Sequence, residues 1–408
     1  MQKRFTPDAG GVFPEWEEVE FGKLFQRRSE KNGDEFGVDK TISVATMHFK
    51  PEGNKAAEES LPKYRVLRKG DIAYEGNKSK HFKHGRFVLN DIGDGIISPI
   101  FEVLQPVSEL SKEVPEFWKY YINYEPVMGK ILAKCANTGI MMNRLAIKDF
   151  YKQKIKVPCI EEQRKIAAAL ATYDEMIAVK TAGLETWQEC KKRMVKEIFG
   201  RTKRFKDDDG NEFPEWEEKT LGKVCESISD GSHFSPKTIK DGKAMLSVKD
   251  MKDCSFDLND CKKISEEDFN TLVKQGCKPK PGDVLLSKDG SVFRYIFKVD
   301  KEIDAVLLSS IAIIRPDAET ANADYLVQCL KNTYLTNGFL RKQTTGTAIK
   351  RVVLKNLKTF KIPLPCMEEQ QKIGSFLAEI DKEIQIQKEF IRTYAEGKKR
   401  MMRELMEG

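Results

Sequence analysis

Two segments of the chain carry apolar side chains at helical spacing. In each segment the apolar positions step by four and three residues, and Lys or Gln interrupts both series at matched places, at 180 and 191 and at 387 and 398. The first series is Ile166, Leu170, Tyr173, Ile177, Leu184, Trp187, Met194 and Ile198, and the second is Ile373, Leu377, Ile380, Ile384, Ile391, Tyr394, Met401 and Leu405. This spacing predicts two long helices, over residues 158–200 and 365–408.

The rest of the chain has a different pattern. Apolar runs rich in β-branched side chains are short there and alternate with Gly, Asn and Asp; examples are residues 86–89, 284–286 and 310–314. Such runs predict strands, and a patch at helical spacing over residues 115–124 predicts one of a few helices. We therefore expect an α+β fold, with two globular parts over residues 1–157 and 201–364.

The chain contains an internal repeat. Residues 4–18, RFTPDAGGVFPEWEE, return at 204–218 as RFKDDDGNEFPEWEE, with ten of fifteen positions identical. The helix start PCIEEQRKI at Pro158 returns as PCMEEQQKI at Pro365, but the residues between these blocks match only sparsely. Alike ends around unlike middles predict a common scaffold that carries two different working surfaces.

Chain continuity predicts how the two long helices pair. The ends of a globular domain usually lie close together. The second globular part starts where the first helix ends, near Gly200, and finishes where the second helix begins, near Pro365. The second helix should therefore run antiparallel to the first as a coiled coil, which makes the chain pseudo-two-fold symmetric.

Composition narrows the class of protein. With 408 residues, 40% of them hydrophobic and 33% charged, the chain has the balance of a soluble protein with two or three domains. No apolar run approaches the roughly 20 residues of a membrane helix, and the first residues open no secretory signal, so we expect a cytoplasmic protein without membrane contact. Nine cysteines without a C-x-x-C pair and four histidines without an HExxH motif indicate neither a disulfide framework nor a metal site.

Motifs of cofactor chemistry are absent from the sequence. It has no G-x-x-x-x-G-K-[ST] loop, no G-x-G-x-x-G after a strand, and no Asn/Asp-Pro-Pro-aromatic tetrad. We therefore expect no catalytic residue and no cofactor in this chain. Asp71 could belong to a metal nuclease because Glu75 and Lys78 follow it, but the second copy does not share these carboxylates, so we interpret the Asp as a turn cap before a strand.

Basic residues cluster in both globular parts and suggest a polyanion as partner. The formal net charge of +7 permits nucleic acid, and residues 78–86 contain four cations, two histidines and Phe82 without an acidic residue. The predicted DNA-binding residues are Lys78, Lys80, Lys83, His84, Arg86, Asn143 and Arg144 in the first copy and Lys288, Ser291, Arg294, Thr345, Thr347, Lys350 and Arg351 in the second. Two unlike basic modules on a spacer suit an asymmetric, two-part DNA sequence.

These features resemble the specificity subunits of type I restriction-modification systems. The resemblance covers essentially the whole chain and rests on the duplicated F-P-E-W-E-E openings, the G-D-[IV] strand starts, the T-G-(x4)-R segments at Thr138 and Thr345, and the P-C-x-E-E-Q-x-K-I helix starts. It implies two target recognition domains, residues 1–157 and 201–364, which each read one half of a bipartite sequence in double-stranded DNA. It also implies that residues 158–200 and 365–408 are the family's conserved helices.

The resemblance further implies which partners carry the chemistry. Two modification subunits would bind the helices and transfer methyl groups from S-adenosylmethionine, and restriction subunits would use ATP and Mg²⁺ to translocate and cut DNA. The residues expected to bind the modification subunits are Glu162, Gln163, Ile166, Leu170, Glu369, Gln370, Ile373, Phe376 and Leu377. Two alternatives remain open on the sequence: a coiled-coil scaffold that binds only proteins, and a self-contained DNA-modifying enzyme.

Overall fold

The computed structural model describes residues 4–50, 52, 58–139, 142–343 and 351–406. The chain divides into two compact units: unit 1 comprises residues 1–181 and 389–408, and unit 2 comprises residues 182–388. Strands and helices occur in both units, so the predicted α+β class is confirmed.

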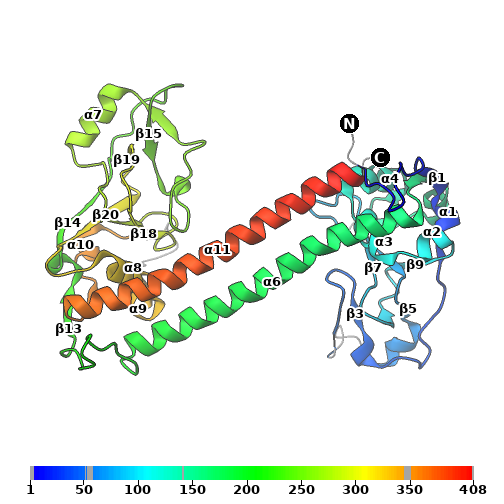
Figure 1. Ribbon diagram of the computed structural model, residues 1–408, viewed down its shortest axis with the longest axis horizontal. Coiled ribbons are helices and arrows are strands. Elements are labelled where there is room, and N and C mark those ends of the chain that lie inside the picture. The colour runs from blue at the N-terminus through cyan, green and yellow to red at the C-terminus, as the bar shows by residue number, and fades with distance from the viewer. Residues whose placement is uncertain (1–3, 51, 53–57, 140–141, 344–350, 407–408) are drawn as a thin grey trace. The chain divides into compact units, whose positions relative to one another are not determined.

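The two predicted long helices are present. They are α6 (Ile160–Phe199) and α11 (Met367–Met406), drawn in green and in orange to red in Figure 1. Each begins with two glutamates in its first turn, where negative charge is favourable because the amino end of a helix is electropositive. Each unit contains the start of one long helix and the end of the other.

Contacts inside each unit show that α6 and α11 run antiparallel. In unit 1 the rings of Tyr173 and Tyr394 lie 6.2 Å apart, and Lys398 Nζ lies 2.5 Å from Asp174 Oδ1. In unit 2 Lys191 pairs with Asp381. The antiparallel pairing is therefore confirmed. Lys191 and Lys398, two of the residues that interrupt the apolar series, each meet a carboxylate of the other helix, which satisfies a charge that would otherwise be buried alone.

Unit 1 is built on a four-stranded antiparallel sheet in the order β2-β9-β6-β7. Its strands are β2 (Phe25–Arg27), β6 (Ile72–Glu75), β7 (Arg86–Leu89) and β9 (Glu102–Pro106). Two-stranded sheets pair β1 (Glu17–Glu20) with β12 (Lys154–Val157), β3 (Ile42–Ser43) with β4 (His48–Phe49), β5 (Arg65–Leu67) with β8 (Gly95–Ile97), and β10 (Ala136–Asn137) with β11 (Arg144–Leu145). The helices besides α6 and α11 are α1 (Phe21–Leu24), α2 (Glu109–Lys112), α3 (Pro115–Tyr121), α4 (Glu125–Cys135) and α5 (Ile147–Tyr151), with 3₁₀ turns η1 (Val38–Lys40) and η2 (Glu58–Lys63).

Unit 2 repeats this plan with the order β14-β20-β17-β18 in its central sheet. These strands are β14 (Cys225–Asp230), β17 (Val284–Ser287), β18 (Ile296–Lys298) and β20 (Ile311–Pro316). The smaller sheets pair β13 (Glu217–Thr220) with β21 (Lys361–Leu364), and β15 (Lys243–Leu246) with both β16 (Lys262–Ile264) and β19 (Ala305–Leu307). The helices besides α6 and α11 are α7 (Glu266–Lys274), α8 (Ala323–Lys331), α9 (Thr333–Gln343) and α10 (Leu354–Leu357), with 3₁₀ turns η3 (Leu221–Lys223) and η4 (Val248–Asp250).

Both cores join the central sheet to the long helices. In unit 1 the core includes Phe87 of β7, Trp118 of α3 and Leu170 of α6, all fully buried. In unit 2 Leu286 of β17 and Leu377 of α11 belong to the equivalent core. Residues of α6 and α11 occur in both cores, so the central sheet of each unit packs against the long helices.

The repeated sequence blocks form a clasp between the opening of each unit and the start of its long helix. In unit 1 Arg4 and Trp16 donate to the carboxylate of Glu162, at 2.8 Å and 3.1 Å. Unit 2 repeats the clasp, with Arg204 and Trp216 each 2.8 Å from Oε2 of Glu369. We call these two sets of three residues the clasps. They explain why the openings and the helix starts are alike in both copies.

Candidate nucleic-acid interface

The basic residues predicted in the first copy lie on the loop that joins β6 to β7 in unit 1. Lys78, Lys80 and Lys83 are exposed there, and His84 is half-buried. Gly85 closes the loop with a φ of +81°, and a Cβ on it would lie 2.6 Å from the carbonyl oxygen of Glu75. The loop is thus a tight crossing between two paired strands that presents several cations to solvent.

The segment around Asn143 braces this loop. The Asn143 amide donates to Gly76 O at 2.8 Å, and its side chain donates to Lys83 O at 3.1 Å. Lys78 Nζ donates to Gly139 O at 3.3 Å, so Gly139 and Asn143 both contact the basic loop. Asn143 is buried and supports the loop, whereas Arg144 on β11 is exposed.

Arg86 is engaged inside unit 1. Its guanidinium donates to Glu75 at 2.8 Å and to Ala45 O at 2.6 Å, and it lies over the ring of Phe82. Ala45 belongs to the turn between β3 and β4, a segment that the sequence did not connect with the basic loop. The geometry therefore makes Arg86 a residue that positions the loop, and it neutralises Glu75, the carboxylate considered for a nuclease.

Unit 2 places the residues predicted in the second copy on the corresponding loop, between β17 and β18. Ser291 and Arg294 are exposed there. The amide of Val352 donates to Lys288 O at 2.9 Å, and Arg351 Nε lies 3.2 Å from Asp289 Oδ1, so residues 351 and 352 brace this loop as well. Thr345, Thr347 and Lys350, which were also predicted here, lie outside the described residues.

Lys288 is a correction to the sequence prediction. Its side chain is only 1% exposed, and its Nζ lies 3.1 Å from Asp230 and 3.6 Å from Asp289. A buried ammonium group needs such partners, because an unpaired charge would be strongly destabilising there. Asp230 ends a strand far away in sequence, and no local pattern pointed to this pairing.

The Gly-Asp pairs have structural roles in both units. Asp71 accepts from the backbone N–H of Arg68 at 2.9 Å and pairs with Arg28 at 2.6 Å. Burial raises the pKa of Asp71, although the Arg28 guanidinium opposes this change. Asp283 of unit 2 accepts from the Lys280 amide at 2.7 Å and pairs with Arg315. The interpretation of these residues as turn caps agrees with the geometry.

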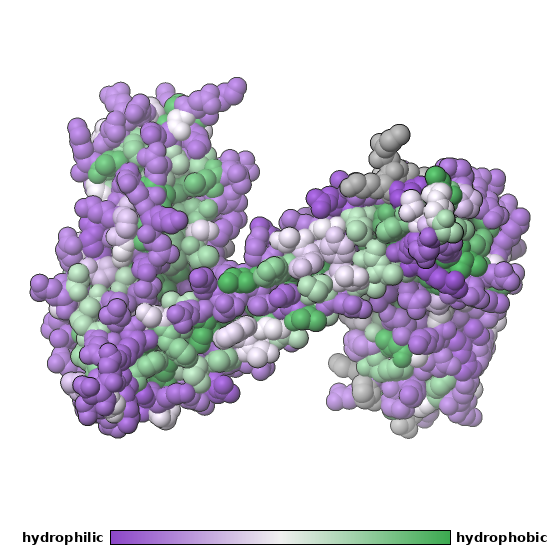
Figure 2. All heavy atoms as spheres, in the orientation of Figure 1, coloured by the Kyte–Doolittle hydropathy of each residue, from purple (hydrophilic) through white to green (hydrophobic). Residues whose placement is uncertain are grey.

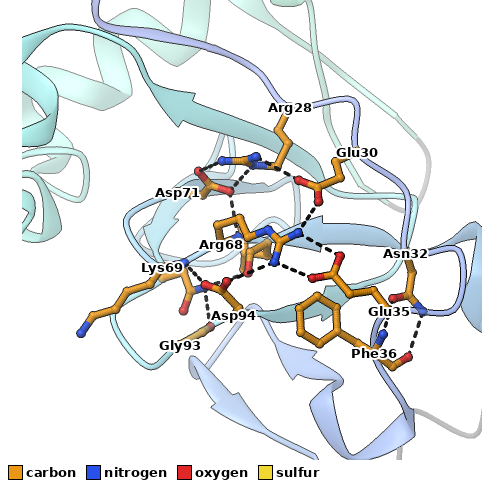
Figure 3. Close-up of polar contacts among 12 residues, drawn as sticks. Arg28, Glu30, Asn32, Glu35, Phe36, Arg68, Lys69, Asp71, Gly93 and Asp94 are labelled. Atoms are coloured by element: carbon orange, nitrogen blue, oxygen red, sulfur yellow. Dashed lines mark hydrogen bonds and ion pairs between the residues drawn. The ribbon is translucent and has the colours of Figure 1, made fainter.

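A network around Arg68 extends this cap in unit 1, as Figure 3 shows. The Arg68 guanidinium pairs with Glu30, with Glu35 at 2.7 Å and with Asp94 at 3.2 Å. The hydrogen bond from Arg68 lowers the pKa of Glu30, and the Lys69 amide does the same for Asp94. Three segments distant in sequence are thereby held together at the edge of the central sheet.

Eight of the nine residues predicted to bind a partner are buried within their own unit. Glu162 and Glu369 belong to the clasps, and the amides of Gln163 and Gln370 donate to the carbonyl oxygens of Pro158 and Pro365. The apolar members of this buried set are Ile166, Leu170, Ile373 and Leu377. The ninth, Phe376, is half-buried against Phe205. Sequence spacing could not distinguish a helix face that is buried within its own unit from one that is exposed for a partner.

Other apolar residues of the long helices are exposed. Val179 of α6 is 65% exposed and Phe390 of α11 is 42% exposed, and both belong to unit 1. Lys180 Nζ lies 4.7 Å from the centre of the Phe390 ring. Figure 2 shows hydrophobic side chains among hydrophilic ones along the surface of the long helices.

The described part of the chain contains neither a membrane-spanning helix nor a group of side chains suited to a metal ion. Within it no helix is long and apolar enough to cross a membrane. The same residues contain no group of three or more His, Cys, Asp or Glu side chains that could hold a metal ion.

Comparison with known families decides the identity. The model of the "Type I restriction modification DNA specificity domain" matches residues 14–186 and 214–393, which is once in each copy of the repeat. The chain belongs to the type I restriction-modification specificity-subunit family. As a specificity subunit it is the DNA-specificity component of a type I restriction-modification complex, and it is non-catalytic within that complex.

Curated relatives and a solved structure agree. The specificity subunit is 25% identical to that of the type I restriction enzyme MjaVIII from Methanocaldococcus jannaschii, over 77% of this chain and 74% of the relative. It is 27% identical to that of EcoBI from Escherichia coli, over 61% of this chain and 56% of the relative. The crystal structure of the S subunit from M. genitalium has a TM-score of 0.65 at 14% identity, covers 98% of this chain and shares its fold.

Proposed function

We propose that each unit reads one half of a bipartite DNA sequence, with residues 1–157 and 201–364 as the target recognition domains. Reading surface 1 is the loop 76–85 with Arg144, and reading surface 2 is the loop 288–295 with Arg351. The observation that carries the proposal is that both units build the same braced hairpin loop at the same place in the central sheet but present different side chains from it.

The exposed side chains suit this role. On reading surface 1 the ammonium groups of Lys78, Lys80 and Lys83 can approach phosphates, which attract cations without regard to sequence. On reading surface 2 Arg294 offers a planar guanidinium that can form two hydrogen bonds to a guanine edge. The partners Glu75 with Arg86, and Lys288 with Asp230, fix the two loops in advance. A braced loop loses less conformational freedom when it binds.

We also propose that the helices over 158–200 and 365–408 bind two modification subunits through their exposed faces. These partners would supply the methyl transfer from S-adenosylmethionine, and restriction subunits that join the complex would supply the ATP- and Mg²⁺-dependent reactions. Exposed apolar side chains such as Phe390 and Val179 support this division, because apolar surface outside a helix pair is available for a partner. Since chromosomal DNA would be the target, the complex would work in the cytoplasm.

The test maps methylated adenines genome-wide in cells that express the complex with variant subunits. Arg294→Ala should relax recognition only in the half read by unit 2, and Lys83→Ala should affect only binding through unit 1. A lost base contact should cost about 1–3 kcal/mol at one position, whereas a lost phosphate contact should weaken all sequences and lower the salt dependence. If Arg294→Ala relaxed recognition of both halves equally, the assignment of one half to each unit would be wrong.

A further inference from the structure

Phe234 of unit 2 has an aromatic ring that is exposed to solvent. It is 65% exposed, on the loop that follows β14. Neighbouring His233 is also largely exposed. A single exposed apolar side chain is common on protein surfaces, so what distinguishes this ring is where the fold places it.

The loop around Phe234 is fixed by hydrogen bonds. The buried Ser232 hydroxyl donates to Phe234 O at 2.7 Å and accepts from the Phe234 amide at 3.0 Å. The Ser309 amide donates to Ser232 O at 2.9 Å, and Lys262 Nζ donates to Ser235 Oγ at 2.7 Å. A Cβ on Gly231 would lie 2.1 Å from Leu307 O, so the loop approaches the neighbouring backbone closely. The ring is thus presented by a braced segment.

A row of polar contacts joins this loop to reading surface 2. His233 Nε2 lies 3.5 Å from Asp230 Oδ2, and the same oxygen lies 3.1 Å from Lys288 Nζ. Lys288 also pairs with Asp289, which pairs with Arg351. Three segments that are distant in sequence therefore meet, and Phe234 is one residue from the end of this row.

We propose that Phe234 is a specificity-determining residue of unit 2, which places its ring against a DNA base beside the cations of reading surface 2. The inference rests on the proposed function of that surface. An apolar side chain can distinguish bases by contact with the thymine methyl group or by insertion between two stacked base pairs. Arg294 can read a guanine edge, but a guanidinium makes no apolar contact with a thymine methyl group, so the Phe234 ring adds what Arg294 and Arg351 do not supply.

In the described part of unit 1, the residues directly after β2 include no exposed aromatic ring. The residues that follow β2, the strand equivalent to β14, include Arg28 and Glu30, which belong to the network around Asp71 and Arg68. The proposed contact is therefore particular to the half-site read by unit 2, as two different half-sites require.

The experiment uses the complex assembled with its modification subunits and a duplex that carries the mapped target. Phe234→Ala should weaken binding to this duplex by about 5- to 100-fold, the range of one good base contact. Binding to a duplex without the target, and the salt dependence, should stay unchanged, because the substitution removes no charge. Leu258→Ala is the matched control, since Leu258 is a 50% exposed apolar residue of the same unit.

Two substituted duplexes distinguish the kinds of contact. Replacing thymine by uracil in the second half-site should reproduce the loss if the ring meets the methyl group, and 2-aminopurine fluorescence should report unstacking if the ring inserts. The inference is overturned if Phe234→Ala and Leu258→Ala weaken binding equally. It is also overturned if Phe234→Ala loses the same affinity for the duplex with the target and for the duplex without it. If Arg294→Ala and Arg351→Ala weaken binding in that case, only the role of Phe234 fails; if neither does, the proposed reading surface fails as well.

Discussion

Some charged residues of the sequence motifs are buried in the fold. Glu369 and Lys288 stand in motifs that suggested contact with a partner and with DNA, yet both side chains are almost completely buried against charges of their own unit. Lys83, which was predicted to bind DNA, is exposed, as a contact with DNA would require. A residue's ion-pair partner from a distant strand has no signature in the local sequence.

Glu369→Gln should destabilise the isolated specificity subunit while leaving partner binding by the folded protein unchanged. The glutamine cannot compensate the Arg204 guanidinium, so we expect a loss of about 2–4 kcal/mol, near the lower end for a broken buried pair. Urea unfolding measures this loss, and Glu368→Gln, at an exposed neighbouring carboxylate, is the control. A stable variant that failed to bind the modification subunit would restore the original assignment of Glu369 to the partner interface.

Asp381→Asn should change how stability depends on pH. Burial alone would raise the pKa of Asp381, but the ammonium groups of Lys331 and Lys191 outweigh this effect and lower it. A carboxyl group with a lowered folded-state pKa stabilises the fold above its unfolded pKa, near 3.8, and this contribution disappears as the pH falls through the folded value. Urea unfolding should therefore separate wild type from Asp381→Asn at pH 6 but much less at pH 3.

Among the elements, the long helices were predictable and the sheet order was not. The apolar period that marks α6 and α11 is written in consecutive residues, so one helix can be recognised without knowing its neighbour. Strand β6 lies between β9 and β7, and nothing in its four residues identifies either neighbour. The candidate site followed the same division: loop 76–85 was visible in the sequence, but the hydrogen bond from Arg86 of β7 to Ala45 O depends on the tertiary fold.

Phe390→Asp should reduce co-purification with the modification subunit if the exposed helix faces bind it. The ring is exposed beside Lys180 and stacks on Tyr394, so its replacement should cost the isolated chain little, about 1 kcal/mol. Thr393→Asp, an exposed position on the same helix, is the control for the added charge. DNA binding by the isolated chain should remain in both variants. Unchanged co-purification of Phe390→Asp would place the partner elsewhere.

At the scale of the whole molecule, both units have the same arrangement of strands and clasps but differ in the side chains between them. The two central sheets have corresponding strand orders, and both clasps use Arg, Trp and Glu at matched positions. The repeat, visible in the sequence, predicted this likeness. It could not predict that Asp71 pairs with Arg28 after β2 whereas Asp283 pairs with Arg315 of β20. The sequences between the repeated ends differ, so the equivalent Asp residues have arginine partners from different elements.

One heptad inserted into both long helices, after Thr181 and after Lys388, should change the gap within the bipartite target. Seven residues add about 10 Å of helix, close to three base pairs at about 3.4 Å each. Both half-sites should stay the same, because neither reading surface is altered. Methylation mapping measures the gap, and a variant with the heptad in α6 alone is the control, since it should disturb the pairing of the helices. An unchanged gap would contradict the role of the helices as the spacer.

The clasps have a consequence for how such a protein acquires a new target. The hydrogen bonds of each clasp are made by residues of the repeated ends, so they would survive an exchange of the residues between Trp16 and Pro158, or between Trp216 and Pro365, as one cassette. Recombination within the repeated ends would install another cassette with Glu162 or Glu369 still clasped. The half-site would then change in one genetic step, without passing through intermediates that read neither the old sequence nor the new one.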